Sequence, residues 1–182
     1  TKLAEQIKEH FDYIIWRSVS NGPSIEDILK DCVRLFSNKQ ANLLSEDVHK
    51  HITHLLGYLR NQRCLLILDN SETLLCEAKH TCQYRAGYEN YGTLIKQIGQ
   101  GRHQSCLLLT SREKPAEIAR LEGEASSVRS LQLRGLKSTV GQEILKDKGL
   151  TGSAQAWNTL IQHYSGNPYA LQIASETVRE IF

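Results

Sequence analysis

Apolar residues in this chain occur either as short unbroken runs or as helical repeats. Residues 64–68 read Cys-Leu-Leu-Ile-Leu and are followed directly by Asp69. An unbroken apolar run is typical of a strand buried on both faces of a parallel sheet. Residues 105–112 repeat the arrangement, with an apolar run that ends in Thr-Ser-Arg. The pattern predicts an α/β fold built on a parallel sheet.

Other segments complete an alternation of helices and strands. Residues 13–19 are rich in aromatic and β-branched side chains and predict a further strand. Helical spacing of apolar residues predicts one helix over 25–36 after a Ser24 cap, and another that starts after a Ser45 cap and ends near residue 60. The remaining predicted elements are a helix within 1–10, loop over most of 71–91, a helix within 92–101, a brief helix at 115–121 and an alternating edge strand at 128–133.

The chain becomes helical throughout after Gly135. Three segments have helical spacing, and the first two end at Gly149 and Gly166, which favour helix ends. We therefore expect an α/β core over residues 1–135 and a small helical subdomain over residues 136–182.

Composition gives little indication of a charged partner. The chain has 22 Lys and Arg against 20 Asp and Glu, so no strong field favours nucleic acid or a membrane surface. No apolar run approaches the roughly 20 residues that span a bilayer, and no signal peptide is evident. We expect a cytoplasmic protein with reduced cysteines. Because the 182 residues contain no methionine, we expect a piece of a longer chain.

Asp69 lies at the end of the predicted strand where ligands bind in parallel sheets. The ligand crevice of such a sheet lies outside the carboxyl ends of its strands. An apolar strand that ends in Asp is also the Walker B pattern, whose carboxylate holds the magnesium ion of a bound nucleoside triphosphate. By itself the pattern fits equally an acid that caps a loop.

Three segments in fixed order carry a more specific signal. They are Leu-Leu-Ile-Leu-Asp-Asn at 65–70, Leu-Leu-Leu-Thr-Ser-Arg at 107–112 and Gly-Asn-Pro-Tyr-Ala-Leu at 166–171. Together they resemble the NB-ARC domain of the STAND signalling ATPases, and residues 84–92 and 110–115 look most similar to cyanobacterial members with propeller repeats. The resemblance implies a Rossmann-like, three-layer P-loop NTPase core followed by a helical subdomain.

The resemblance also implies what the protein does. It implies an ATP/ADP switch in signal transduction that acts with Mg²⁺, and further repeat or sensor domains and effector domains in the same chain. It implies homo-oligomerisation on activation. It gives no indication of a membrane or nucleic-acid partner.

The resemblance implies roles for individual residues. Asp69 would be the Walker B ligand of Mg²⁺, directly or through water. Arg112 would be the first sensor arginine, whose planar guanidinium suits a terminal phosphate. Thr110 would line the nucleotide beside it. Gly166 and Pro168 match the Gly-x-Pro motif, whose proline packs against adenine.

Simpler alternatives stay open for two of these residues. Arg112 can instead be a surface arginine that pairs with Glu113 or Glu117. Pro168 can instead be an ordinary first-turn proline of a helix.

The sequence departs from the family in two respects. Asn70 replaces a second acid, and an amide can orient a water molecule but cannot accept its proton. Glu72 is the nearest spare carboxylate, so Asp69, Asn70, Glu72 and Arg112 form the candidate catalytic set, with slow or absent hydrolysis. A degenerate scaffold that binds protein partners without turning nucleotide over is the alternative.

The second departure concerns the phosphate loop. Its Gly-Lys-Thr or Gly-Lys-Ser ending does not occur in the chain, and the first residues look like the helix that follows that loop. Because backbone amides of the loop supply most phosphate contacts, we expect these residues alone to bind nucleotide poorly and to be inactive.

Other candidate residues favour ordinary structural roles. His49, His51 and His54 predict a solvated helix face, and Trp16 and Trp157 predict core anchors. A zinc site has weak support, because its three ligands would lack a paired Cys-x-x-Cys. Those ligands are Cys76, His80 and Cys82.

Overall fold

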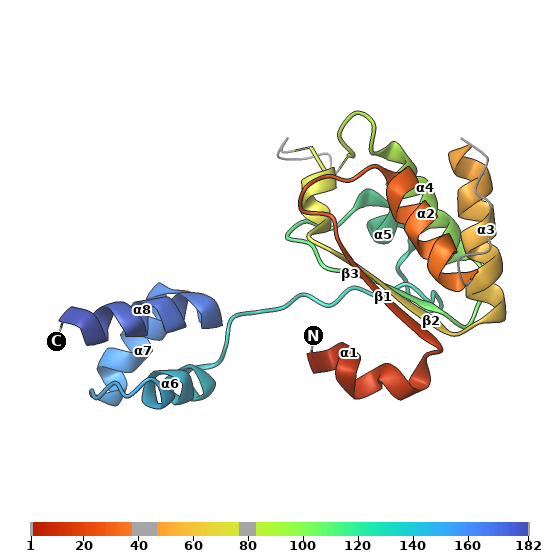
Figure 1. Cartoon of the computed structure of the whole chain (residues 1–182). Coiled ribbons are helices and arrows are strands. Elements are labelled where there is room, and N and C mark those ends of the chain that lie inside the picture. Colours follow the sequence, from red (N-terminus) through yellow and green to blue (C-terminus); the bar gives the residue numbers. More distant parts are fainter. Residues whose placement is uncertain (1, 38–46, 77–82, 182) are drawn as a thin grey trace. The chain divides into compact units, whose positions relative to one another are not determined.

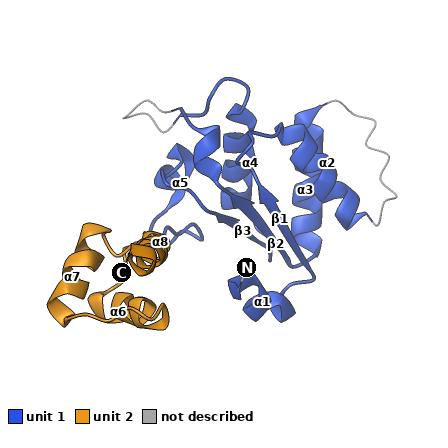
Figure 2. Cartoon of the chain, turned by 60° about the vertical axis from the view of Figure 1, so that its left-hand side comes forward, with its two compact units in different colours: residues 1–130 blue, residues 131–182 orange. Residues whose placement is uncertain are grey.

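The computed structural model describes residues 2–37, 47–76 and 83–181. The chain divides into two compact units, unit 1 at residues 1–130 and unit 2 at residues 131–182 (Figure 2). The predicted boundary lies at residue 136, within unit 2.

Unit 1 is built on a parallel sheet. Its strands are β1 (Tyr13–Ser18), β2 (Cys64–Asp69) and β3 (Cys106–Leu109), and they pair in the order β1-β2-β3 (Figure 1). Strand β2 is central and buried along its apolar run. The predicted α/β fold with a parallel sheet is therefore confirmed.

Three helices lie on one side of the sheet in both views. They are α2 (Ile25–Phe36), α3 (Val48–Asn61) and α4 (Glu89–Gln100) (Figures 1 and 2). The predicted Ser24 cap is confirmed, since its Oγ accepts from the backbone N–H of Asp27 at 3.2 Å. Helix α3 is capped by Asp47, while the predicted cap Ser45 lies outside the described residues.

The shorter helical elements of unit 1 complete the fold. Helix α1 (Lys2–Ile7) and the 3₁₀ turn η1 (Lys8–His10) precede β1, and α1 lies across the sheet from α2–α4. The 3₁₀ turn η2 (Ser71–Leu74) follows β2, so the loop predicted over 71–91 is partly ordered. Helix α5 (Ala116–Leu121) packs against α4, and its prediction is confirmed.

The core of unit 1 lies between the sheet and α2–α4. Successive strand residues face opposite sides, so Ile15 is buried toward the helices at 4% exposure while Trp16 is 45% exposed on the other face. The prediction of a core role for Trp16 is therefore wrong. The buried core members are Ile15, Val19, Ile25, Ile28, Leu29, Cys32, Phe36, Ile52, Leu55, Leu59, Cys64, Leu66, Leu68, Leu74, Tyr91, Leu94 and Ile98.

The prediction of a solvated position is wrong for His51. Its side chain is 1% exposed, and neither ring nitrogen has a hydrogen-bond partner within the described parts of the chain. It lies three positions after Val48 and four before Leu55, which places it on the apolar face of α3. The predicted solvated face holds for His49 and His54, which are exposed.

The edge strand predicted at 128–133 does not form. Leu131 and Leu133 are extended and about 85% exposed, and they belong to no sheet of the described chain. The preceding residues close a loop instead, because the Arg129 guanidinium donates to the carbonyl oxygens of Gly123 at 2.7 Å and Glu124 at 3.0 Å. The segment alternates as a strand would, but no strand of the described chain pairs with it.

Unit 2 consists of three helices around a small core. They are α6 (Ser138–Asp147), α7 (Ala154–His163) and α8 (Pro168–Ile181). The buried apolar side chains are Leu145, Ile161 and Leu171, and Trp157 packs against them as predicted.

The structure also bears on the state of the cysteines and on the character of the helices. The four described cysteines are free thiols, as expected. No described helix combines the length and apolar character needed to span a membrane.

Candidate functional site

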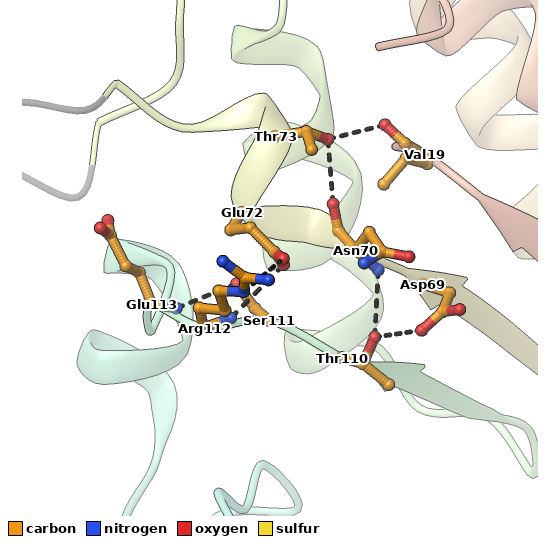
Figure 3. A network of polar contacts seen from close by, with 9 residues as sticks. All are labelled: Val19, Asp69, Asn70, Glu72, Thr73, Thr110, Ser111, Arg112 and Glu113. Carbon is orange, nitrogen blue, oxygen red and sulfur yellow. Dashed lines mark hydrogen bonds and ion pairs between the residues drawn. The ribbon is translucent and has the colours of Figure 1, made fainter. Parts of the chain in front are cut away.

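The candidate site begins where β2 and β3 end. The pairing of Leu68 with Leu109 brings Asp69 beside Thr110 at the carboxyl edge of the sheet. The Thr110 hydroxyl donates to Asp69 Oδ1 and accepts from the backbone N–H of Asn70 at 3.0 Å (Figure 3). One hydroxyl thus fixes both the carboxylate and the turn that follows it.

The turn after Asp69 is held from several directions. Asn70 adopts a left-handed conformation with φ of 66°, which asparagine tolerates better than most residues. The backbone N–H of Ser71 donates to the Thr110 carbonyl oxygen at 2.9 Å, and the Thr73 hydroxyl donates to the Val19 carbonyl oxygen at 2.7 Å. These bonds join the ends of all three strands to η2.

Glu72, on η2, pairs with Arg112. Arg112 Nε lies 3.6 Å from Glu72 Oε1, and the backbone N–H of Arg112 donates to Oε2 at 3.4 Å (Figure 3). The Arg112 side chain is 89% exposed and that of Glu72 21%. The suggested alternative partners, Glu113 and Glu117, are therefore not the ones that the structure pairs with Arg112.

Two tyrosines at the start of α4 make hydrogen bonds that the sequence analysis did not predict. Tyr88 donates to the Gly22 carbonyl oxygen at 2.6 Å, and Tyr91 to the Pro23 carbonyl oxygen at 3.1 Å. They tie the loop after β1 to the start of α4. Tyr88 is the N-cap residue of α4 and Tyr91 lies in its first turn, so the spacing of three residues was the available signal.

Thiol chemistry is not favoured in this core. Cys32 on α2 and Cys64 at the start of β2 are both buried, and burial raises the pKa of the Cys32 thiol to about 12. The pKa of Cys64 is also raised, chiefly by burial. Because the thiolate is the reactive form, neither is a suitable nucleophile at neutral pH.

The oxygen donors at the sheet edge fit magnesium with a nucleotide. Mg²⁺ is commonly held by one or two carboxylates together with substrate phosphates and water. Asp69 supplies such a carboxylate, already oriented by Thr110. The described residues contain no group of three His, Cys, Asp or Glu side chains able to hold a metal alone. Two ligands of the weak zinc hypothesis, His80 and Cys82, lie outside them.

The remaining predicted site residues belong to unit 2. Gly166 has φ of 66°, and its carbonyl oxygen accepts from the backbone N–H of Leu136 at 2.8 Å. Asn167 Oδ1 accepts from the backbone N–H groups of Tyr169 and Ala170 and so caps α8. Pro168 is the first residue of α8, which fits an ordinary first-turn proline.

The structure thus brings five predicted residues together at one edge of the sheet. They are Asp69, Asn70, Glu72, Thr110 and Arg112. Gly166 and Pro168 lie in the other unit, and their role at a nucleotide stays a prediction.

Comparison with known proteins gives a family match over the first part of the chain. Residues 1–76, which include Asp69, match the NB-ARC domain family. An uncharacterized WD repeat-containing protein of Nostoc sp. (strain PCC 7120) is 45% identical over 172 residues, 94% of this chain. The chain spans 14% of the length of that relative. The match to the NB-ARC domain family therefore covers the part of the chain that contains β1, β2 and Asp69.

Proposed function

We propose that this chain is the nucleotide-binding part of a STAND-type switch that binds ATP or ADP with Mg²⁺. The observation that carries the proposal is the Asp69 carboxylate, fixed by Thr110 at the carboxyl edge of a parallel sheet. That edge is where such sheets bind ligands, and the match to the NB-ARC family implies a nucleotide-binding signalling module.

The chain's own residues would divide the work of binding. Asp69 would hold Mg²⁺ directly or through water, and the bound ion would supply positive charge to the phosphates. Thr110 keeps the Asp69 carboxylate in place, and Arg112 reaches the terminal phosphate. Gly166 and Pro168 present the adenine surface of the helical unit.

Hydrolysis is expected to be slow or absent. Asn70 lies where a base would be needed, and its amide cannot accept a proton from water. The nearest further carboxylate, Glu72, is occupied by Arg112. A protein with these residues would hold its nucleotide rather than turn it over quickly.

Switching would follow from different contacts to ATP and ADP. A ligand shifts a two-state equilibrium only by its difference in affinity for the two states. A terminal phosphate bound by Arg112 supplies that difference. Because the Nostoc relative is named for WD repeats, we propose that repeat domains of the same chain report the switch, with assembly into homo-oligomers in the ATP state.

The test is calorimetric titration of the full-length protein with ATP and with ADP, with and without Mg²⁺. Asp69→Ala should remove the Mg²⁺-dependent part of the affinity. The matched control is Glu113→Ala, which removes an exposed carboxylate from the neighbouring segment and should bind as the parent does.

The second candidate is a scaffold that has kept the fold but binds only protein partners. Asn70 favours it, because the position lacks a catalytic acid. Absence of ATP and ADP binding by the full-length protein would support the scaffold and contradict the switch.

A further inference from the structure

The Glu72 carboxylate has a fixed position. Its turn, η2, is anchored by Ser71 to the Thr110 carbonyl oxygen and by Thr73 to the Val19 carbonyl oxygen. The side chain itself is 21% exposed. Glu72 therefore presents its charge from a rigid support beside the site.

The Arg112 side chain, unlike that of Glu72, is free to change its direction. Its side chain is 89% exposed and forms an ion pair with Glu72, whose carboxylate also accepts from the Arg112 backbone N–H. Figure 3 shows the guanidinium directed toward Glu72, with Asp69 at the far end of the labelled group. A side chain this exposed can change its direction without disturbing the core.

The two partners that Arg112 could bind compete for the same donors. A carboxylate and a phosphate both bind the planar fork of N–H groups, and both prefer two parallel hydrogen bonds. Arg112 Nε already faces Glu72 Oε1 at 3.6 Å. A phosphate bound near Asp69 would have to draw the same nitrogen away.

We infer that Glu72 is a positioning residue that holds Arg112 in the nucleotide-free protein and must release it before the arginine binds a terminal phosphate. This inference rests on the proposed function. It gives Glu72 a role other than that of a base. Release costs free energy only when a terminal phosphate is bound, so Glu72 lowers the affinity for ATP and leaves that for ADP unchanged.

The test compares ATP and ADP affinities of the full-length protein, measured by calorimetry with Mg²⁺. Glu72→Gln keeps an oxygen that accepts from the Arg112 backbone but removes the charge. Exposed ion pairs contribute about 0.2–1 kcal/mol, so ATP should bind up to about fivefold more tightly while ADP binds as before. The effect should shrink as salt is raised.

Two further variants isolate the pair. Glu113→Gln removes the same charge from an exposed neighbour that does not pair with Arg112, and controls for general repulsion of the triphosphate. Arg112→Gln should weaken ATP and spare ADP, and adding Glu72→Gln to it should change nothing more.

Each outcome decides between the hypotheses. Equal gains from Glu72→Gln and Glu113→Gln would overturn the inference, because charge alone would explain them. Weaker ATP binding in Glu72→Gln would also overturn it, since Glu72 would then assist the arginine. Absence of binding in the parent protein would instead reject the proposed function itself.

Discussion

Unit 1 and unit 2 enclose cores of very different size. In unit 1, β1, β2 and α2–α4 bury aliphatic and aromatic side chains, and β3 adds partly buried leucines. In unit 2 the described core is Leu145, Ile161 and Leu171, with Trp157 against it. A unit of about 50 residues buries a smaller share of its surface, so its stability is marginal. Because unit 2 has the smaller core, we expect it to unfold locally at a lower free-energy cost than unit 1.

Glycine makes the small core possible. A Cβ on Gly141 would lie 2.8 Å from Ile161 Cδ1, so α6 and α7 approach more closely than a larger residue permits. A Cβ on Gly135 would lie 1.9 Å from the Ser165 carbonyl oxygen. Unit 2 therefore depends on close backbone approach where unit 1 depends on buried volume.

The largest effect should come from removing volume in unit 1. Leu66 lies on β2 and is 1% exposed, so Leu66→Ala should lower the free energy of unfolding by about 2–5 kcal/mol. Urea unfolding followed by circular dichroism measures this. Leu131→Ala, at an 85% exposed leucine, should change it by less than about 0.5 kcal/mol. Equal effects would contradict the assignment of the core.

Gly135→Ala should act on unit 2 alone. The new methyl group meets backbone atoms, which cannot turn aside, and such overpacking costs about 1–3 kcal/mol. Amide hydrogen exchange should rise across residues 138–181 and stay unchanged in β2. The control is Gly123→Ala, since nothing lies within 4 Å of a Cβ there. Faster exchange in both units would show that the two do not unfold independently.

His51 is a defect within the larger core. Both ring nitrogens lack hydrogen-bond partners among the described residues, and an unsatisfied buried polar group costs about 1–3 kcal/mol. His51→Leu should therefore raise the free energy of unfolding by about 1 kcal/mol. His54→Leu, at an exposed position on the same helix, should leave it nearly unchanged. Destabilisation by His51→Leu would instead indicate that the His51 ring makes a stabilising hydrogen bond.

His51 and Trp16 show what sequence patterns leave undecided. The three histidines of α3 predicted a solvated face, whereas the burial of His51 depends on its place in the apolar stripe of the helix. Trp16 lies in β1, where successive side chains point to opposite faces of the sheet. Which of them are buried depends on which face the helices cover. Periodicity identified both elements but not the face that each residue takes in three dimensions.

The fold was more predictable than the site. Apolar runs identified β2 and β3, and β2 is buried along its run as such a pattern predicts. At 128–133 the alternation of apolar and polar residues predicted a strand that does not form, since a strand also needs a pairing partner. At the site, Asp69 and Thr110 followed from strand ends. The Glu72–Arg112 pair joins segments 40 residues apart and depends on side-chain direction, which spacing does not encode.

The smallest effect concerns an exposed ion pair that joins two helices of unit 2. Lys148 Nζ donates to Glu176 Oε1 at 2.8 Å, and this hydrogen bond lowers the pKa of Glu176 below its usual 4.5. Since the folded pKa is the lower one, the pair stabilises unit 2 above the unfolded pKa, and this contribution is lost as pH falls through the folded value. Lys148→Gln should therefore speed exchange in unit 2 slightly at pH 7 and leave it unchanged below the folded pKa. Lys96→Gln, at an exposed lysine of α4, should have no effect on unit 2 at either pH. A pH-independent effect of Lys148→Gln would assign the lysine a packing role, and the smaller core would then depend on aliphatic contact rather than on charge at its surface.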